Sequence, residues 1–301
     1  MNASTDGTPP VRALFFEFPD EVELVGVDRQ FMIGGDVLVT PALESGVTEV
    51  DGKVQLNSFS ASRVDWVFLL LPYFPWIGFF PGRGGVVWRD WYTHAQVEIQ
   101  DEGTTTLPAP LGHINVHIRS GAALLLHAEP RYTTYETREG PYELLVSLSS
   151  DESGSAFGWV YIDDGESWPP GPSKTIRITT TSSLVKTTTG SGVGSTSNSK
   201  TNSKGGEKGQ MVSLQPQGEF VIEQKLVRVV VLGVVDRPKG VEVRSKGTDG
   251  DEGVAVGEDR WVYVTGLQKL VVEVEVDLNA DRKSTRLNSS HSGESRMPSS
   301  A

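Results

Sequence analysis

Hydrophobic residues along this chain recur at every second position, and this periodicity limits the fold more than any other feature of the sequence. In residues 272–278, valine and leucine alternate with glutamate and aspartate, and in residues 113–119, isoleucine and valine alternate with polar side chains. Successive side chains of a strand point to opposite faces, so this pattern predicts strands with one face in a core and one in water. Asp-Gly turn pairs at 51–52, 164–165 and 249–250 separate such strands. We therefore predict an all-β chain built of antiparallel sandwiches.

The charge balance argues against two classes of partner. Lys and Arg together number 27 against 39 for Asp and Glu, which gives a formal net charge of -12. No basic stripe interleaved with aromatic residues occurs in the sequence, so we expect neither nucleic acid nor a membrane as a partner. The chain has no cysteine, which excludes disulfides and thiolate metal sites. We expect no cofactor and no metal.

Two segments break the strand pattern. Residues 179–209 consist mainly of Thr, Ser, Gly and Lys, a composition that buries too little apolar area to offset the entropy of ordering. Because strand-like sequence resumes on both sides, we expect a mobile loop inserted within one sandwich, with a linker between domains as the alternative. Residues 281–301 have no periodicity and read as a translation of a common short-read sequencing adapter. We therefore expect a non-native tail there.

Five segments in a fixed order resemble the C-terminal end of glycoside hydrolase family 31, the fungal secreted α-glucosidases in particular. Their sequences are GTPPVRALFFEF at 7–18, DRQFMIG with VLVTP at 28–41, WRDWYT at 88–93, LPAPLGHINVHIR at 107–119 and GWVYIDDGES at 158–167. Ser120 stands where that family usually has a second glycine, and Leu126 where it usually has a proline. These departures concern local strand geometry only.

The resemblance implies a domain order. Residues 1–36 would end a (β/α)8 catalytic barrel, 37–136 would form a proximal C-terminal β-sandwich, and 137–280 a distal one. It also implies a retaining hydrolase of α-glucosidic bonds in oligosaccharides, whose aspartate nucleophile and aspartate acid/base lie on barrel strands upstream of Met1. We therefore assign no catalytic residue in this chain and expect it to be inactive alone. The proximal sandwich would brace the barrel through apolar strands at 37–39 and 114–118.

The same resemblance suggests a secreted glycoprotein. The polar N-terminus lacks the apolar core of a secretion signal, so we expect any such signal upstream of Met1. Asn2-Ala3-Ser4 forms a glycosylation sequon. A noncatalytic carbohydrate-binding β-sandwich protein is the alternative function.

Residues 53–78 interrupt the family pattern with a dense apolar run that contains Pro72 and Pro75. This run is too short and too broken for a membrane helix, which needs about 20 apolar residues. We interpret the block as a retained intron, because Gly52-Lys53 can encode a splice donor, Ile77-Gly78 can encode an acceptor, and its removal keeps the frame. The alternative is a genuine loop, whose exposed apolar surface would predict a partner or aggregation.

Several polar residues could be mistaken for a functional site. His113 and His117 lie four residues apart on a predicted strand, roughly 13 Å from each other, which is too far to share a metal. We expect a structural, solvent-facing role for both. Asp163 and Asp164 suggest the paired carboxylates of a glycosidase, but Asp164-Gly165 is a hairpin signal and predicts a turn.

Two further carboxylates and four aromatic residues remain. Glu17 and Asp36 have no acid/base partner nearby in the sequence, so we expect them to be structural. The aromatic residues could stack on sugar rings, yet alternating spacing favours packing between sheets. They are Trp88, Trp91, Tyr92 and Trp159.

Overall fold

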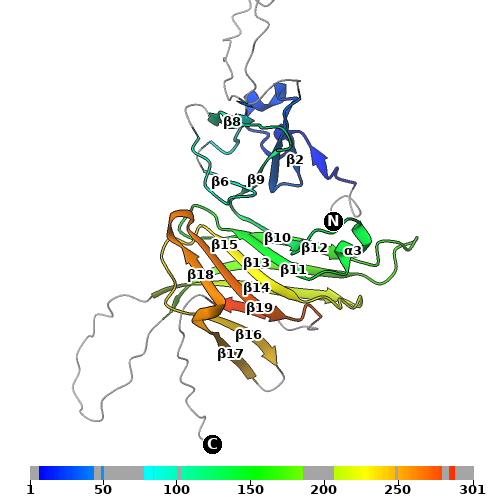
Figure 1. The fold of residues 1–301 in the computed structure, drawn as a ribbon, viewed down its shortest axis with the longest axis vertical. Coiled ribbons are helices and arrows are strands. Elements are labelled where there is room, and N and C mark those ends of the chain that lie inside the picture. The colour runs from blue at the N-terminus through cyan, green and yellow to red at the C-terminus, as the bar shows by residue number, and fades with distance from the viewer. Residues whose placement is uncertain are drawn as a thin grey trace, which may run out of the picture. The chain divides into compact units, whose positions relative to one another are not determined.

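In the computed structural model, strands far outnumber helices among the described residues, which confirms the all-β prediction. The chain divides into two compact units, Met1–Ala122 and Ala123–Ala301 (Figure 1). The described residues are 7–43, 49–50, 78–83, 85–99, 103–185, 207–247, 250–279 and 285–288.

The first unit is organised around a five-stranded sheet with the strand order β1-β2-β3-β9-β6. All four pairings in this sheet are antiparallel. Its strands are β1 (Val11–Arg12), β2 (Phe31–Ile33), β3 (Val37–Thr40), β6 (Trp88–Asp90) and β9 (Asn115–Arg119). Two short pairs complete the unit, β4 (Glu49–Val50) with β8 (Leu107–Pro108) and β5 (Gly78–Phe79) with β7 (Thr104–Thr105). The helix α2 (Leu14–Glu17) and the 3-10 helix η1 (Val22–Gly26) connect β1 to β2.

One hydrophobic core holds the first unit together. Trp88 on β6 is fully buried and is the largest side chain in it. Its indole Nε1 donates a 2.8 Å hydrogen bond to the carbonyl oxygen of Pro81, and its ring meets Phe80 edge-on at 6.2 Å. Gln30 links the sheet to β5, because its side chain accepts from the Phe79 amide at 2.6 Å and donates to Thr40 Oγ1 at 2.7 Å.

The second unit is one sheet whose strand order is β17-β16-β20-β14-β13-β12-β10-β11-β15-β19-β18. Its first strands along the chain are β10 (Ala122–His127), β11 (Tyr142–Ser147), β12 (Phe157–Ile162), β13 (Lys174–Val185) and β14 (Glu207–Gly218). The later strands are β15 (Leu226–Leu232), β16 (Val241–Gly247), β17 (Gly250–Val256), β18 (Trp261–Val264), β19 (Lys269–Val276) and β20 (Thr285–Asn288). Three short helices connect strands: α3 (Thr134–Arg138), η4 (Glu258–Arg260) and η5 (Thr265–Leu267).

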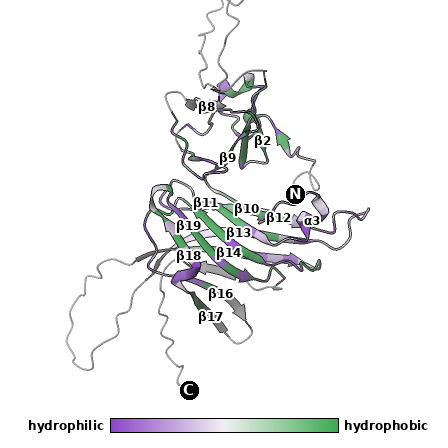
Figure 2. Ribbon diagram, viewed as in Figure 1, coloured by the Kyte–Doolittle hydropathy of each residue, from purple (hydrophilic) through white to green (hydrophobic). Residues whose placement is uncertain are grey.

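Both halves of this sheet contribute to a single core. Ile176 and Ile178 of β13 share it with Val229 of β15 and Val272 of β19, and Figure 2 shows β11 and β19 as mainly hydrophobic. The sheet therefore curls over its own apolar face like a sandwich. The alternation predicted for residues 272–278 is confirmed, since Val272, Val274, Val276 and Leu278 are buried between exposed acidic residues.

One pairing departs from the antiparallel prediction. β11 and β15 run parallel, with Leu144 opposite Val229 and Val146 opposite Val231. Parallel neighbours need a long crossover connection, and here the chain passes through β12, β13 and β14 before it returns to β11. The period-two pattern carries no information on strand direction, so the sequence could not reveal this pairing.

The boundaries of the units differ from those expected. The division falls between Ala122 and Ala123 and not at 136/137, because β10 and α3 belong with the second sheet. Strands from 1–36 and from 37–136 form one sheet in the first unit. Within the predicted loop at 179–209, residues 179–185 and 207–209 are strand, and β13 pairs with β14 along its whole length. Residues 186–206 lie outside the described part.

Two other predicted segments are described only in part. Residues 53–77 of the interpreted intron lie outside the described residues, whereas Gly78 is buried and pairs with Thr105. Of the tail at 281–301, only β20 is described, and it pairs with both β14 and β16. Its origin as an adapter translation stays a prediction.

Candidate functional site

A cluster of four charged side chains in the first unit is the place where the predicted carboxylates meet. Glu17, at the end of α2, accepts a hydrogen bond from Arg12 Nη1 of β1. Asp36 lies in the turn between β2 and β3, and its carbonyl accepts from the Arg119 amide of β9 at 2.8 Å. The guanidinium of Arg119 lies 4.7 Å from the Phe18 ring centroid and donates to the carbonyl of Gly35 at 3.3 Å. We call these residues, Arg12, Glu17, Asp36 and Arg119, the charge cluster.

Burial and neighbouring charges act in opposite directions on Asp36. Burial is the largest effect and raises the pKa of its carboxyl. The nearby carboxylate of Glu17 raises this pKa further, whereas the guanidinium groups of Arg119 and Arg12 lower it. The two acids are therefore close enough to interact, although they lie far apart in the sequence.

The packing of Glu17 argues against glycosidase chemistry at the charge cluster. A Cβ added to Gly35 would lie 2.8 Å from Glu17 Oε2, so this carboxylate packs directly against backbone. Arg12 holds the other oxygen. A glycosidase needs its two acids roughly 5–10 Å apart on opposite sides of a sugar bond. The carboxylate of Glu17 is held between an arginine and the main chain, so no sugar can lie between it and Asp36. The geometry supports the predicted structural role.

The expected solvent-facing role of His117 is wrong. Its side chain is 1% exposed and packs edge-on against Phe80 with ring centroids 4.8 Å apart, while Ile114 on the supposed apolar face is 53% exposed. Asn115 is also buried, and its side-chain amide donates to the carbonyl of Pro108 at 3.1 Å. The polar face of β9 is thus buried, and the opposite face is buried as well at Ile118. His113 lies outside the strand, with its ring 5.0 Å from that of Tyr92.

The burial of His117 predicts a loss of stability in acid. Burial lowers the pKa of His117 to about 4, against the attraction of Asp90, which raises it, and the repulsion of His113, which lowers it. In the unfolded chain this imidazole takes a proton near its ordinary pKa of 6.5. Between pH 6.5 and 4 the unfolded state therefore binds more protons than the folded state. The free energy of unfolding should fall by about 3 kcal/mol as the pH falls through this range. Chemical unfolding at pH 7 and pH 4 measures this loss.

The matched variants for this prediction are His117→Gln and His113→Gln. His117→Gln should be less stable at pH 7 but should lose much less stability in acid, because it has no imidazole to protonate. His113→Gln should keep most of the slope of the wild type, because His113 has the smallest effect on the pKa of His117. Equal slopes for the wild type and His117→Gln would contradict the burial argument.

Asp163 and Asp164 shape the tip of the hairpin between β12 and β13. The carboxylate of Asp163 accepts from the Gly165 amide at 2.9 Å, and that of Asp164 accepts from the amides of Glu166 and Ser167 at 3.1 Å. Hydrogen bonds from Ser167 and Glu166 lower the pKa of the Asp164 carboxyl. Both carboxylates accept hydrogen bonds from backbone amides of the turn, as the turn interpretation expects.

The four aromatic candidates divide between core and surface. Trp88 packs in the core as predicted, and Trp91 is half-buried. Tyr92 and Trp159, in contrast, are 55% and 47% exposed, so core packing is the wrong interpretation for these two. Trp159 lies on the solvent face of β12, opposite Arg177 of β13.

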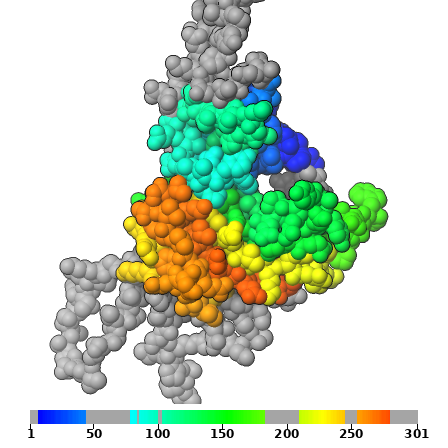
Figure 3. Space-filling model, in the orientation of Figure 1, coloured from blue at the N-terminus to red at the C-terminus, as the bar shows by residue number. Residues whose placement is uncertain are grey.

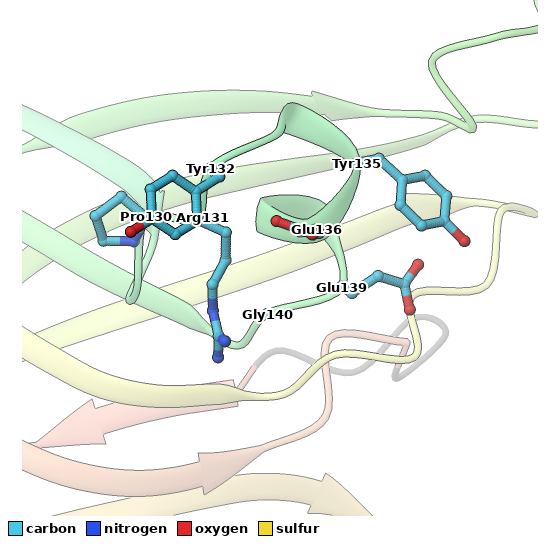
Figure 4. A pocket seen from close by; sticks show the side chains of 7 residues that line it. All are labelled: Pro130, Arg131, Tyr132, Tyr135, Glu136, Glu139 and Gly140. Carbon is cyan, nitrogen blue, oxygen red and sulfur yellow. The ribbon is translucent and has the colours of Figure 1, made fainter.

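The second unit also has a surface depression that was not predicted from the sequence. It has a volume of about 760 Å³ and is lined by Pro130, Arg131, Tyr132, Tyr135, Glu136, Glu139 and Gly140 (Figure 4). Tyr132 and Tyr135 are 105% and 67% exposed. Two tyrosines three residues apart, next to a proline and outside any alternating pattern, are the signal that could have indicated it.

Other kinds of site find no support in the described residues. No group of three or more His, Asp or Glu residues there could hold a metal ion. None of the helices described is long and apolar enough to cross a membrane. Asn2 of the glycosylation sequon lies outside the described part of the chain.

Sequence comparison identifies relatives of almost the whole chain. Residues 7–58 match the glycosyl hydrolase family 31 C-terminal domain. An α-glucosidase of Schizosaccharomyces pombe is 35% identical over 89% of this chain, which corresponds to 22% of the relative. Glucoamylase 1 of Schwanniomyces occidentalis is 34% identical over 88% of the chain and 21% of its own length. An α-glucosidase of Aspergillus niger is 32% identical over 89% and 22%.

Solved structures agree with this relationship at the level of the fold. The glucosidase II α subunit superimposes with a TM-score of 0.63 at 19% identity, over 96% of this chain and 26% of that one. A family 31 dextranase of Flavobacterium johnsoniae gives a TM-score of 0.61 at 16% identity, over 96% and 30%. The chain spans about a fifth of the length of the curated relatives it matches. By sequence and by fold, it belongs to glycoside hydrolase family 31 and corresponds to the C-terminal β-rich part of that family.

Proposed function

We propose that this chain is the C-terminal part of an enzyme that hydrolyses terminal α-glucosidic bonds in oligosaccharides. The observation that carries the proposal is that relatives named α-glucosidase or glucoamylase align over almost the entire chain at 31–35% identity. The substrate would bind in a catalytic barrel encoded upstream of Met1. Both catalytic aspartates would lie in that barrel, so we propose that the chain alone is inactive.

The chain would act by supporting that barrel, because a misplacement of about 1 Å in a catalytic group can cost around 100-fold in rate. The residues expected to form the contact need correction, however. Residues 37–39 are buried in the first unit itself, as is Ile118. A group of apolar side chains on β1, α2, η1 and β2 is exposed instead, and a surface of this kind is typical of an interface. Its members are Val11, Phe15, Phe16, Val22, Val25 and Ile33.

The compartment follows from the same proposal. We propose that the longer protein is secreted, with its export signal upstream of Met1 and with Asn2 as a glycosylation site. We also propose that nucleic acid is not a partner, which the net charge of -12 supports.

The coding sequence upstream of Met1 tests the proposal. It should encode a (β/α)8 barrel with two aspartates, and the joined protein should hydrolyse a nitrophenyl α-glucoside. A promoter and stop codons immediately upstream would contradict the proposal and favour the noncatalytic carbohydrate-binding protein.

A further inference from the structure

The connection between β10 and β11 is a closed surface loop that carries α3. Its ends meet where the Ala128 amide donates a 2.8 Å hydrogen bond to the Pro141 carbonyl. In Figure 1 the loop lies beside β12, and in Figure 3 the green part of the chain to which it belongs is exposed on the face shown. Compact loops with closed ends are frequently functional. The loop spans residues 128–141.

Hydrogen bonds within the loop hold it in one conformation. Thr133 Oγ1 accepts from the Glu136 amide at 3.1 Å and caps the start of α3. Thr137 Oγ1 donates to the Thr133 carbonyl at 2.8 Å and accepts from the Arg131 amide at 3.0 Å. The backbone on both sides of the two tyrosines is therefore fixed before any ligand arrives, which reduces the entropy that binding costs.

The depression on this loop combines aromatic rings with carboxylates. Figure 4 shows Tyr132 with Pro130 and Arg131 on one side of α3, and Tyr135 with Glu139 on the other. The volume of about 760 Å³ lies within the range of small-molecule sites, roughly 300–1,000 Å³. A protein interface would need about 800 Å² of surface on each partner, which is more than the seven lining residues offer, so the depression suits a small or narrow ligand.

We propose that this depression binds a neutral oligosaccharide. The faces of Tyr132 and Tyr135 carry the negative side of the ring quadrupole, which attracts the C–H groups on a pyranose face. Tyrosine also offers a large contact area with only two rotatable bonds, so little entropy is lost when it is buried. The carboxylates of Glu136 and Glu139 accept hydrogen bonds from sugar hydroxyls.

The charge of the lining disfavours acidic sugars and phosphorylated ligands. Glu136 and Glu139 contribute two negative charges, while the guanidinium of Arg131 bonds to Glu129 at 2.9 Å. An anionic ligand would therefore meet a surface of its own sign. The expected preference for α-linked glucose units rests on the proposed function, whereas the assignment of a neutral sugar rests on the loop itself.

Electrophoresis of the full chain through gels that contain soluble starch tests the site. The wild type should be retarded, and Tyr132→Ala or Tyr135→Ala should each weaken the apparent affinity by about tenfold. Both rings are exposed, so both variants should keep the circular dichroism spectrum of the wild type. Tyr92→Ala and Trp159→Ala remove exposed rings elsewhere and serve as matched controls that should migrate as the wild type does.

The other outcomes contradict either the site itself or only its preference for α-glucans. Absence of retardation in starch and in hydroxyethylcellulose would overturn the site. If Trp159→Ala abolished the retardation and the tyrosine variants kept it, the sugar would bind on the face of β12. This result would also overturn the proposed site. Retardation in hydroxyethylcellulose alone would support a sugar site but contradict the preference for α-glucans. None of these results depends on hydrolysis by the joined protein, so a failure here is distinct from a failure of the proposed function.

Discussion

Replacement of Trp88 by alanine should destabilise the first unit by about 3–5 kcal/mol, the largest effect expected of any single truncation in it. The side chain is fully buried among the core residues of β2, β3 and α2. Its removal leaves a cavity the size of an indole and also leaves the Pro81 carbonyl without the hydrogen bond it accepts. A loss of this size is a large fraction of the stability of a small domain. Hydrogen exchange, which reports on the two units separately, measures it.

Two variants separate the causes. Trp88→Phe keeps most of the ring but loses the hydrogen bond to Pro81, so it should cost about 1–2 kcal/mol. Trp168→Ala removes an indole that is 90% exposed and should change stability by less than about 0.5 kcal/mol. If Trp88→Ala resembled Trp168→Ala, the core described for the first unit would be wrong.

Gly158→Ala should open the second sheet between β10 and β12. A Cβ at this buried position would overlap the backbone carbonyl of Ala123. Backbone in the middle of a sheet cannot move aside as the end of a flexible side chain can, so the pairing must separate. We expect a loss of about 3 kcal/mol or more, at the upper end of overpacking costs. Urea unfolding of the second unit measures this loss.

Gly266→Ala is the matched control, because nothing lies within 4 Å of a Cβ added there. This substitution should leave stability within about 0.5 kcal/mol of the wild type. Equal stabilities for Gly158→Ala and Gly266→Ala would show that β10 and β12 are not in the contact described.

The strands were predictable where one face of a sheet meets a core and the other meets water. In β19 the valines are buried and the glutamates exposed, as the alternation indicates. In β9 the same alternation fails, because both faces of the strand are covered: Ile118 is fully buried on one face, and His117 packs on Phe80 on the other. A periodic pattern identifies two faces, and only the tertiary contacts decide whether one or both are buried.

The sites depend still more on contacts between distant parts of the chain. Glu17 and Asp36 had no partner nearby in the sequence, yet folding brings them together with Arg12 and Arg119. Tyr132 and Tyr135 belong to no strand, so the alternation of aromatic residues along strands could not indicate them. The turn at Asp164-Gly165 was easier to predict from the sequence, because its hydrogen bonds join residues only a few positions apart.

If this chain supports a glucosidase without carrying its acid pair, the purified chain should not turn over a nitrophenyl α-glucoside. We predict no release of nitrophenol above the uncatalysed rate, and no difference between the wild type and Glu17→Gln or Asp36→Asn. Hydrolysis that persists through purification and disappears in either variant would place an acid pair in the charge cluster and contradict the account.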